Sequence, residues 1–148
     1  MPDVDLRALE VLLVEDSDED AELTLRALKK RRLANLVHRV SDGEEALEFL
    51  FGSGRYADRG TSPPRVVLLD LKLPKVGGLE VLKAIRSDER TAMTPVVVLT
   101  SSAEDRDLND CYRLGVNSYI VKPVEFDAFF QAVEQLGLYW AVLNRTVP

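Results

Sequence analysis

The chain of 148 residues is predicted to fold as one α/β domain, a doubly wound parallel sheet with helices on both faces. Two observations carry this prediction. Five short apolar runs rich in Val, Ile and Leu recur along the sequence, and segments with helical spacing of apolar residues lie between them. Most runs are continuous rather than alternating, which is typical of strands buried on both faces of a parallel sheet. In such a sheet the crossovers are right-handed and the ligand site lies at the carboxyl ends of the strands.

The expected strands are the apolar runs at residues 11–14, 36–40, 66–69, 96–99 and 119–121. Each expected helix presents apolar residues on one face. In chain order these are Ala21, Leu25 and Leu28; Ala46, Leu47 and Leu50; Leu79, Leu82 and Ile85; Leu108, Cys111 and Tyr112 within 103–114; and Phe126, Phe129, Phe130, Val133 and Leu136. Three helix starts are indicated by capping or helix-breaking residues: Asp42 with Glu45, Ser101 or Ser102, and Pro123.

Composition excludes several classes of protein. The net charge is −6, from 25 acidic and 19 basic residues, which argues against nucleic acid as a direct partner. No apolar run approaches the roughly 18 residues of a membrane helix and no signal peptide is visible, so we expect a cytoplasmic protein without a membrane partner. The single Cys111 and the single His38 exclude an internal disulfide and a multi-histidine metal site. We interpret Cys111 as a small core residue and His38 as a surface strand residue.

Residues 52–64 contain three glycines and two prolines and form a long connection before the third strand. We interpret this segment as a solvated loop, with a partner-contact insertion as the alternative. No composition shift marks a second domain. We therefore expect a single domain over 1–148, with a core of about 9–136 and an apolar helical extension of about 137–145.

Acidic residues crowd the start of the first expected helix, where they suit the helix macrodipole, and we interpret them as helix-start charge: Asp18, Glu19 and Asp20. Other polar residues directly follow four of the five apolar runs: Glu15 and Asp16, Asp70, Thr100, and Lys122. Because the carboxyl ends of parallel strands meet at one edge of the sheet, we expect these side chains to converge. Three clustered carboxylates repel one another and take up protons unless a cation lies among them.

This set of residues supports a narrow range of chemistry. Hard oxygen ligands suit Mg²⁺, which keeps part of its water and binds phosphate oxygens. An aspartate beside Mg²⁺ and a lysine can attack phosphorus and form an aspartyl phosphate. The metal and Lys122 would offset the charge of the transferring group, and Thr100 could donate a hydrogen bond to it. Each residue also has a simpler interpretation as a helix cap or turn residue, but the convergence of all of them favours a phosphoryl site.

Four motifs, in order along the chain, resemble the response-regulator receiver domain of two-component signalling: Val14-Glu15-Asp16; Asp70-x-x-Leu73-Pro74-x-x-x-Gly78-x-Glu80; Val98-Leu99-Thr100-Ser101; and Tyr119-x-x-Lys122-Pro123. Each motif alone is weak, but the ordered set is specific and covers essentially the whole chain. The resemblance implies a flavodoxin-like (βα)5 three-layer sandwich whose five-stranded parallel sheet has the order 2-1-3-4-5.

The resemblance also implies a role for each site residue. Asp70 would be the phospho-acceptor. Mg²⁺ would be bound by Asp70 and by the acidic pair Glu15 and Asp16, of which Asp16 is favoured as the direct ligand. The backbone carbonyl of Lys72 would also contact the metal. Thr100 would be the switch hydroxyl and Tyr119 the switch aromatic residue. Lys122 would contact the phosphate, and the Lys122-Pro123 peptide bond would be cis.

Within this family, the sequence is most similar to the stand-alone single-domain regulators paired with bacterial phytochrome histidine kinases. The features are the acidic run at 15–21, the loop at 52–64 and the Leu138-Tyr139-Trp140 tail. The similarity implies a regulator without an output domain that is activated by phosphorylation. It would accept its phosphoryl group from a histidine kinase, with a bacteriophytochrome as the candidate, and would signal to an unknown downstream protein by contact. It would catalyse only its own phosphorylation and dephosphorylation, so we do not expect a turnover enzyme.

Three alternatives stay open. The domain could be a phosphate carrier or sink in a phosphorelay. It could be a metal-dependent phosphohydrolase, although Lys72 stands where such an enzyme would carry a second acid. It could also be an interaction module whose site has lapsed, against which the complete set of site residues argues.

An apolar tail follows Gly137, and its apolar residues no longer follow one helical stripe. An exposed aromatic patch of this kind indicates an interface. We therefore expect a homodimer built on the fifth helix and the tail: Phe130, Leu138, Tyr139, Trp140 and Leu143.

Overall fold

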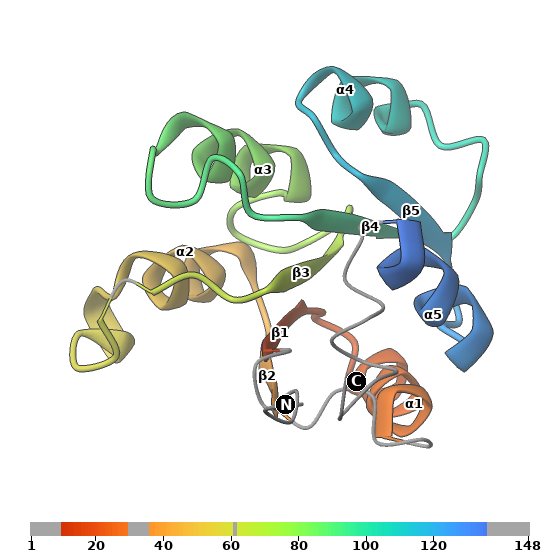
Figure 1. The fold of residues 1–148 in the computed structure, drawn as a ribbon, viewed down its shortest axis with the longest axis horizontal. Coiled ribbons are helices and arrows are strands. Elements are labelled where there is room, and N and C mark those ends of the chain that lie inside the picture. The colour runs from red at the N-terminus through yellow and green to blue at the C-terminus, as the bar shows by residue number, and fades with distance from the viewer. Residues whose placement is uncertain (1–9, 30–35, 61, 136–148) are drawn as a thin grey trace, which may run out of the picture.

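Five parallel strands form one sheet in the order β2-β1-β3-β4-β5 within the residues that the computed structural model describes, 10–29, 36–60 and 62–135 (Figure 1). The strands are β1 Glu10–Val14, β2 Leu36–Val40, β3 Val66–Asp70, β4 Val96–Thr100 and β5 Ser118–Val121. The helices are α1 Asp18–Lys29, α2 Gly43–Phe51, α3 Gly78–Ser87, α4 Asp107–Arg113 and α5 Phe126–Gln135, with a 3-10 turn, η2, at Gly54–Tyr56. The predicted fold class and the strand order 2-1-3-4-5 are confirmed.

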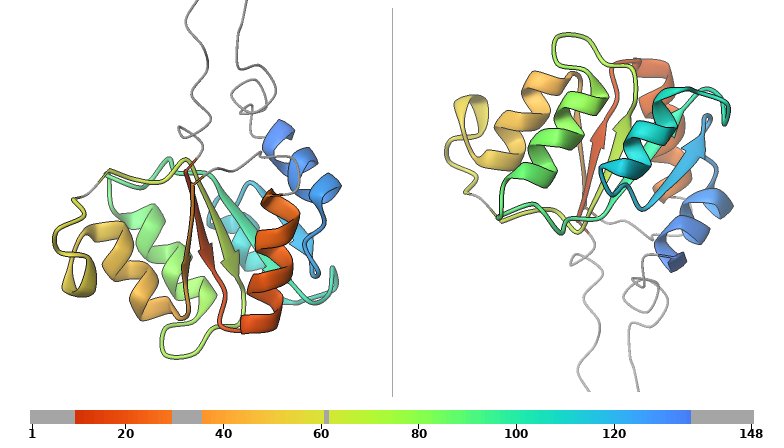
Figure 2. Two further views of the ribbon diagram at one scale, coloured as in Figure 1. Left: turned by 90° about the horizontal axis from the view of Figure 1, so that it is seen from below. Right: turned by 90° about the horizontal axis from the view of Figure 1, so that it is seen from above.

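Helices cover both faces of the sheet, with α1 and α5 on one face and α2, α3 and α4 on the other (Figure 2). Successive residues of a central strand therefore enter different cores. Leu13 packs in the core that includes Phe129 of α5, whereas Leu12 packs in the core that includes Leu82 of α3. Strands β3 and β4 are buried at every position. This double coverage is why their sequences are continuously apolar.

The parallel register brings the carboxyl ends of the strands to one edge of the sheet. Strand β1 is in register with both β2 and β3 up to its last residue. Backbone hydrogen bonds continue one residue past the strands, since the N–H of Glu15 donates to the oxygen of Val40 at 3.0 Å and that of Lys122 to the oxygen of Thr100 at 2.7 Å. The residues that follow the strands are thereby fixed to the sheet.

Helix starts follow the prediction in part. Asp42 caps α2, and its Oδ1 accepts the Glu45 N–H at 2.7 Å, as predicted. Helix α4 begins later than predicted, and neither Ser101 nor Ser102 caps it. Instead, Ser102 Oγ accepts the N–H of Glu104 at 3.0 Å, and Asp105 Oδ1 accepts that of Asp107 at 2.9 Å. These side-chain turns satisfy backbone donors that the predicted first turn would have used, so the helix starts only at Asp107.

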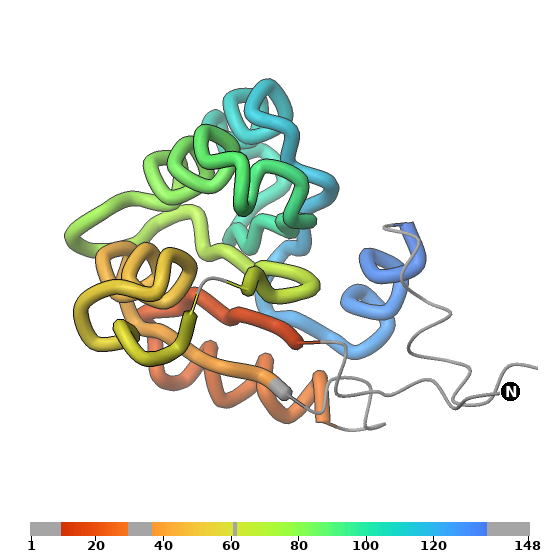
Figure 3. Tube along the Cα trace, turned by 60° about the vertical axis from the view of Figure 1, so that its left-hand side comes forward, coloured from red at the N-terminus to blue at the C-terminus, as the bar shows by residue number. Residues whose placement is uncertain are grey.

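Most of the described residues of the segment 52–64 are exposed, as predicted for a solvated loop, and the segment runs beside α2 (Figure 3). Its Arg59 guanidinium lies 3.8 Å from the centroid of the Phe49 ring, and its Nη1 donates to the Phe49 oxygen at 2.8 Å. Tyr56 donates from its hydroxyl to Glu45 Oε2 at 2.5 Å. The segment is therefore anchored to α2 by an aromatic contact, a cation–π contact and hydrogen bonds, which sequence spacing alone does not reveal.

His38 also departs from the prediction. It is half-buried rather than on the surface, because its ring stacks on Phe49 at a centroid distance of 4.5 Å and its Nε2 lies 3.2 Å from the Tyr56 hydroxyl. Burial lowers the pKa of His38 below its ordinary value. The interpretation of Cys111 is confirmed, since it is fully buried in the core and burial raises the pKa of its thiol to about 11.

The predicted dimer interface is described only in part. Phe130 is half-buried against the α1–α5 core, and its ring centroid lies 6.1 Å from that of Phe126. Leu136 and the predicted interface residues of the tail lie outside the described residues: Leu138, Tyr139, Trp140 and Leu143. The homodimer therefore stays a prediction. None of the helices in the described ranges is long and apolar enough to cross a membrane.

We expect Arg59→Met to lower the free energy of unfolding by about 2 kcal/mol, because it removes a cation–π contact and charged hydrogen bonds. Arg55→Met is the matched control, because Arg55 lies in the same segment but pairs with Glu48 on the surface. Its cost should be much smaller, because an exposed ion pair contributes little to stability. Urea unfolding measures both values, and equal values would show that the segment is not anchored by Arg59.

Candidate functional site

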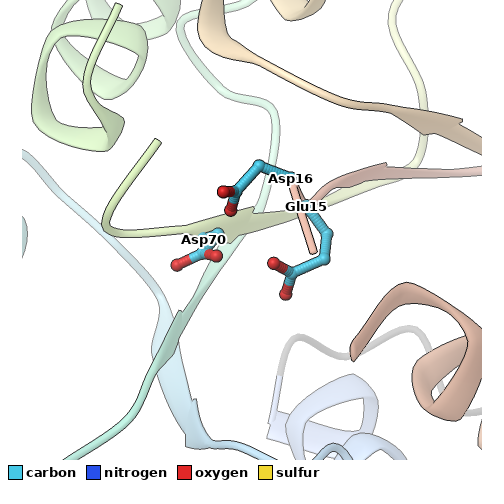
Figure 4. Close-up of side chains that lie close together, drawn as sticks. All are labelled: Glu15, Asp16 and Asp70. Atoms are coloured by element: carbon cyan, nitrogen blue, oxygen red, sulfur yellow. The ribbon is translucent and has the colours of Figure 1, made fainter. Parts of the chain in front are cut away.

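Three carboxylates meet at the carboxyl edge of β1 and β3 (Figure 4). Glu15 and Asp16 follow β1, Asp70 is the last residue of β3, and one oxygen of each lies within 4.8 Å of the others. Glu15 and Asp70 are buried, with 0% and 4% of their surface exposed, whereas Asp16 is exposed. The residues predicted from the strand ends are thus brought together as two buried acids and one that faces solvent.

Lys122 follows β5 and places its ammonium among these acids. Its Nζ lies 3.0 Å from Asp70 Oδ2 and 3.2 Å from Glu15 Oε1. A further ion pair joins it to Asp20 Oδ2, in the first turn of α1, at 3.1 Å. The peptide bond between Lys122 and Pro123 is cis. The ammonium supplies the positive partner without which two buried carboxylates would be costly.

The protonation of these groups follows from their surroundings. The pKa of Glu15 is raised from 4.5 to about 7, first by burial and then by the Asp70 carboxylate, against smaller opposing effects of Ser17 and Lys122. Burial lowers the pKa of Lys122, but its contacts with Asp70 and Asp20 outweigh burial and hold that pKa well above its ordinary value. Lys122 therefore keeps its charge, whereas Glu15 loses its proton near neutral pH.

The loop between β1 and α1 is held by Arg39 of β2. Arg39 Nε and Nη2 donate to the backbone oxygen of Glu15 at 3.0 and 2.8 Å, and Nη1 donates to Asp18 Oδ1 at 2.8 Å. On the other side, Glu15 Oε2 accepts the N–H of Ser17 at 3.2 Å. These contacts fix the backbone of the β1–α1 loop and thereby the position of Glu15 and Asp16.

A cavity of about 210 Å³ opens beside Asp70, lined in part by Asp16, Lys72 and Thr100. Thr100 is 2% exposed, and its hydroxyl donates to the backbone oxygen of Ser102 at 3.0 Å. The backbone N–H of Lys72 donates to Asp70 Oδ1 at 3.1 Å, and the Lys72 side chain is exposed. The cavity is therefore lined by the carboxylates of Asp16 and Asp70 and by the hydroxyl of Thr100.

Tyr119 lies away from this cavity. It is half-buried and packs against the core that contains Leu108 and Cys111 of α4. The sequence places it on β5, and the strand does include it, but among the described residues no hydrogen bond or ion pair joins it to the carboxylates. Its switch role stays a prediction.

Sequence reasoning missed three residues of the site. Asp20 was interpreted as helix-start charge, yet its carboxylate contacts Lys122. Arg39 had no assigned role, and Asp105 Oδ2 lies 3.5 Å from Thr100 Oγ1. A signal in the sequence exists only for Asp20, which lies in the acidic first turn of α1, shortly after the acidic pair. The other two depend on how β2 and the β4–α4 loop approach the site.

The acidic cluster suits a divalent cation of the hard type. Its donors are carboxylate oxygens, which Mg²⁺ prefers, and they come from Glu15, Asp16 and Asp70. Lys122 balances one of these charges, and the neighbouring Asp70 carboxylate adds to the effect of burial in raising the pKa of Glu15. A cation at this point would offset the remaining negative charge.

Comparison with known proteins identifies relatives over most of the chain. Residues 11–134 match the family model of the response regulator receiver domain. The structure of the bacteriophytochrome response regulator AtBRR is 54% identical, with 90% of this chain and 96% of that chain covered and a TM-score of 0.83. The probable methanogenesis regulatory protein FilR2 of Methanothrix harundinacea is 43% identical over 136 residues, which are 92% of this chain and 86% of the relative.

Two further structures bear on the chemistry of the site. One is the Mn²⁺-bound form of response regulator Rcp1, which is 36% identical, with 93% of this chain and 97% of that chain covered and a TM-score of 0.72. The other is the phosphorylated cyanobacterial phytochrome response regulator RcpA, which is 40% identical, with 88% and 92% covered and a TM-score of 0.72.

We expect the Glu15→Gln variant to be more stable than the wild type at pH 8 by about 2 kcal/mol and equally stable at about pH 4. The raised pKa means that the folded state binds the Glu15 proton more tightly than the unfolded chain does. Stability from this group is therefore complete below pH 4.5 and is lost as the pH rises through about 7.

Urea unfolding in EDTA across this pH range measures the difference. Glu19→Gln is the control, because Glu19 is an exposed glutamate in the first turn of α1. A Glu15→Gln variant that loses stability with pH as steeply as the wild type would contradict the assignment of the proton to Glu15.

Proposed function

Because the chain belongs to the response regulator receiver domain family, we propose that it is a phosphorylation-activated regulator in which Asp70 accepts a phosphoryl group from a histidine kinase. The observation that carries the proposal is the contact of Lys122 Nζ with Asp70 Oδ2 at 3.0 Å, inside a cluster of three acids. An aspartate held beside a fixed cation, at a cavity open to a donor, is suited to attack on phosphorus.

The transfer step exchanges one bond to phosphorus for another. An oxygen of Asp70 forms a bond to phosphorus as the bond from phosphorus to the imidazole nitrogen of a phosphohistidine breaks, and the electron pair leaves with that nitrogen. Lys122 offsets the charge on the transferring oxygens, and its raised pKa keeps it charged at any working pH. Lys72 orients the carboxylate through its backbone N–H.

The proposed cofactor is Mg²⁺. Glu15, Asp16 and Asp70 would hold it with the backbone carbonyl of Lys72, and Asp16 is the favoured direct ligand because its carboxylate faces solvent. When bound, Mg²⁺ neutralises charge on the acids and on the phosphoryl oxygens. The existence of a Mn²⁺-bound form of the relative Rcp1 supports the binding of a divalent cation.

Phosphorylation would switch protein contacts rather than start turnover. The Thr100 hydroxyl, which now donates to Ser102, would turn to a phosphoryl oxygen, and Tyr119 would follow inward. The affected face is α4 and β5, and a change from mostly off to mostly on requires about 5.5 kcal/mol of differential stabilisation. A turnover phosphohydrolase is disfavoured because the position two residues after Asp70 is an exposed lysine, Lys72.

The proposed partners follow from the relatives. Receiver domains pair with histidine kinases, and the similarity to the bacteriophytochrome regulator AtBRR and the phytochrome regulator RcpA makes a bacteriophytochrome the candidate kinase, in the cytoplasm. The proposed output is contact with a downstream protein, with a homodimer formed through the residues named above: Phe130, Leu138, Tyr139, Trp140 and Leu143. A role as phosphate carrier uses the same chemistry and differs only in where the phosphoryl group goes next.

We expect Asp70→Asn to abolish acid-labile labelling by ³²P-acetyl phosphate in the presence of Mg²⁺, because the amide cannot act as the nucleophile. EDTA should have the same effect on the wild type. Asp58→Asn, which changes an exposed aspartate of the 52–64 segment, is the matched control and should label normally. Normal labelling of the Asp70→Asn variant would show that the acceptor is another residue.

A further inference from the structure

Asp20 is a carboxylate at the site that the proposed transfer step does not use. Its backbone N–H donates to Ser17 Oγ at 3.2 Å, which fixes it in the first turn of α1, and its Oδ2 lies 3.1 Å from Lys122 Nζ. Its side chain is 37% exposed, against 0% for Glu15 and 5% for Asp70. Of the three acids on this ammonium, Asp20 therefore has by far the best access to water.

The donors of Lys122 are fully used. An ammonium has three N–H groups, and within the described residues three carboxylate oxygens lie at hydrogen-bond distance from Nζ: those of Glu15, Asp20 and Asp70. A phosphoryl group on Asp70 brings new charged oxygens that compete for the same donors. At least one existing contact must then lengthen or break.

The cost of breaking each contact decides which one is lost. Glu15 is fully buried, so no water would hydrate its carboxylate if it lost the ammonium of Lys122. A buried acceptor without a partner is costly. The partly exposed carboxylate of Asp20 regains hydration when it leaves Lys122. The contact with Asp20 is therefore the one that breaks at least cost.

We propose that Asp20 is a positioning residue that acts through Lys122, holding the ammonium toward α1 before phosphorylation and competing with the phosphoryl oxygens for it afterwards. This inference rests on the proposed role of Asp70 as phospho-acceptor. Asp20 then lowers the affinity of the site for a phosphoryl group and shifts the balance toward the unphosphorylated arrangement. Its release also separates the first turn of α1 from the residue that follows β5.

Asp18 provides a matched control for the charge of Asp20. It lies in the same turn of α1, but its Oδ1 pairs with Arg39 Nη1 at 2.8 Å, and its side chain is 94% exposed. Asp18→Asn and Asp20→Asn change the net charge equally and remove the same kind of charge from the start of the helix. Only the second removes a competitor for Lys122.

The test is the affinity of the full chain for beryllofluoride, a phosphoryl analogue, measured by calorimetry in saturating Mg²⁺. Asp20→Asn should lower the Kd by about fivefold, which corresponds to about 1 kcal/mol for a partly exposed ion pair. Asp20→Glu, which keeps the charge within reach of Lys122, should stay close to the wild-type value. Asp18→Asn should do the same.

Two outcomes overturn the inference. An equal gain in affinity for Asp18→Asn and Asp20→Asn would mean that only the long-range charge matters. A Tm lowered equally with and without beryllofluoride, with no change in Kd, would mean that Asp20 merely stabilises the fold.

Failure of the proposed function gives a different result. In that case the wild type would not bind beryllofluoride, or Asp70→Asn would bind it as tightly as the wild type. Binding that depends on Asp70 but is unchanged in Asp20→Asn overturns only the role of Asp20.

Discussion

The ion pairs of Lys122 with Glu15 and Asp70 are the interaction on which the site depends. Two carboxylates with almost no exposure stand within a few ångströms of each other, and burying such a pair without a cationic partner is costly. Lys122 follows β5, whereas the two acids stand at the ends of β1 and β3. The ion pairs between them therefore exist only because β4 pairs with β5 in the correct register. The strand order is thus a condition for the charge balance.

Coverage of the sheet explains why the polar groups gather at one edge. Helices bury both faces, so β3 and β4 have no position along their length that could present a charge to solvent. Polar side chains are tolerated where the strands end and the helices have not yet begun. The site is consequently assembled from segments far apart in the sequence, each contributing the residue after its apolar run.

This coverage also explains what could be predicted from the sequence. Asp70, Thr100 and Lys122 each follow an apolar run, so a one-dimensional pattern locates them. Arg39 could not be found in this way, because its contact with the Glu15 carbonyl depends on the approach of β2 to the β1–α1 loop. Asp20 was assigned to the macrodipole, since a local explanation was sufficient and its contact with Lys122 is made only in the folded chain.

The groups proposed to contact the phosphoryl oxygens already have partners in this structure. The Thr100 hydroxyl donates to the Ser102 carbonyl, and the ammonium of Lys122 is shared among carboxylates. Phosphorylation would therefore exchange hydrogen bonds rather than add them, and only the difference in strength between the old and new bonds drives the switch. Charge-assisted bonds to a phosphoryl group are stronger than a hydroxyl–carbonyl bond. The release of a partly exposed acid such as Asp20 costs less than that of a buried one. The free-energy difference between the two states can therefore be small enough for one phosphoryl group to reverse their populations.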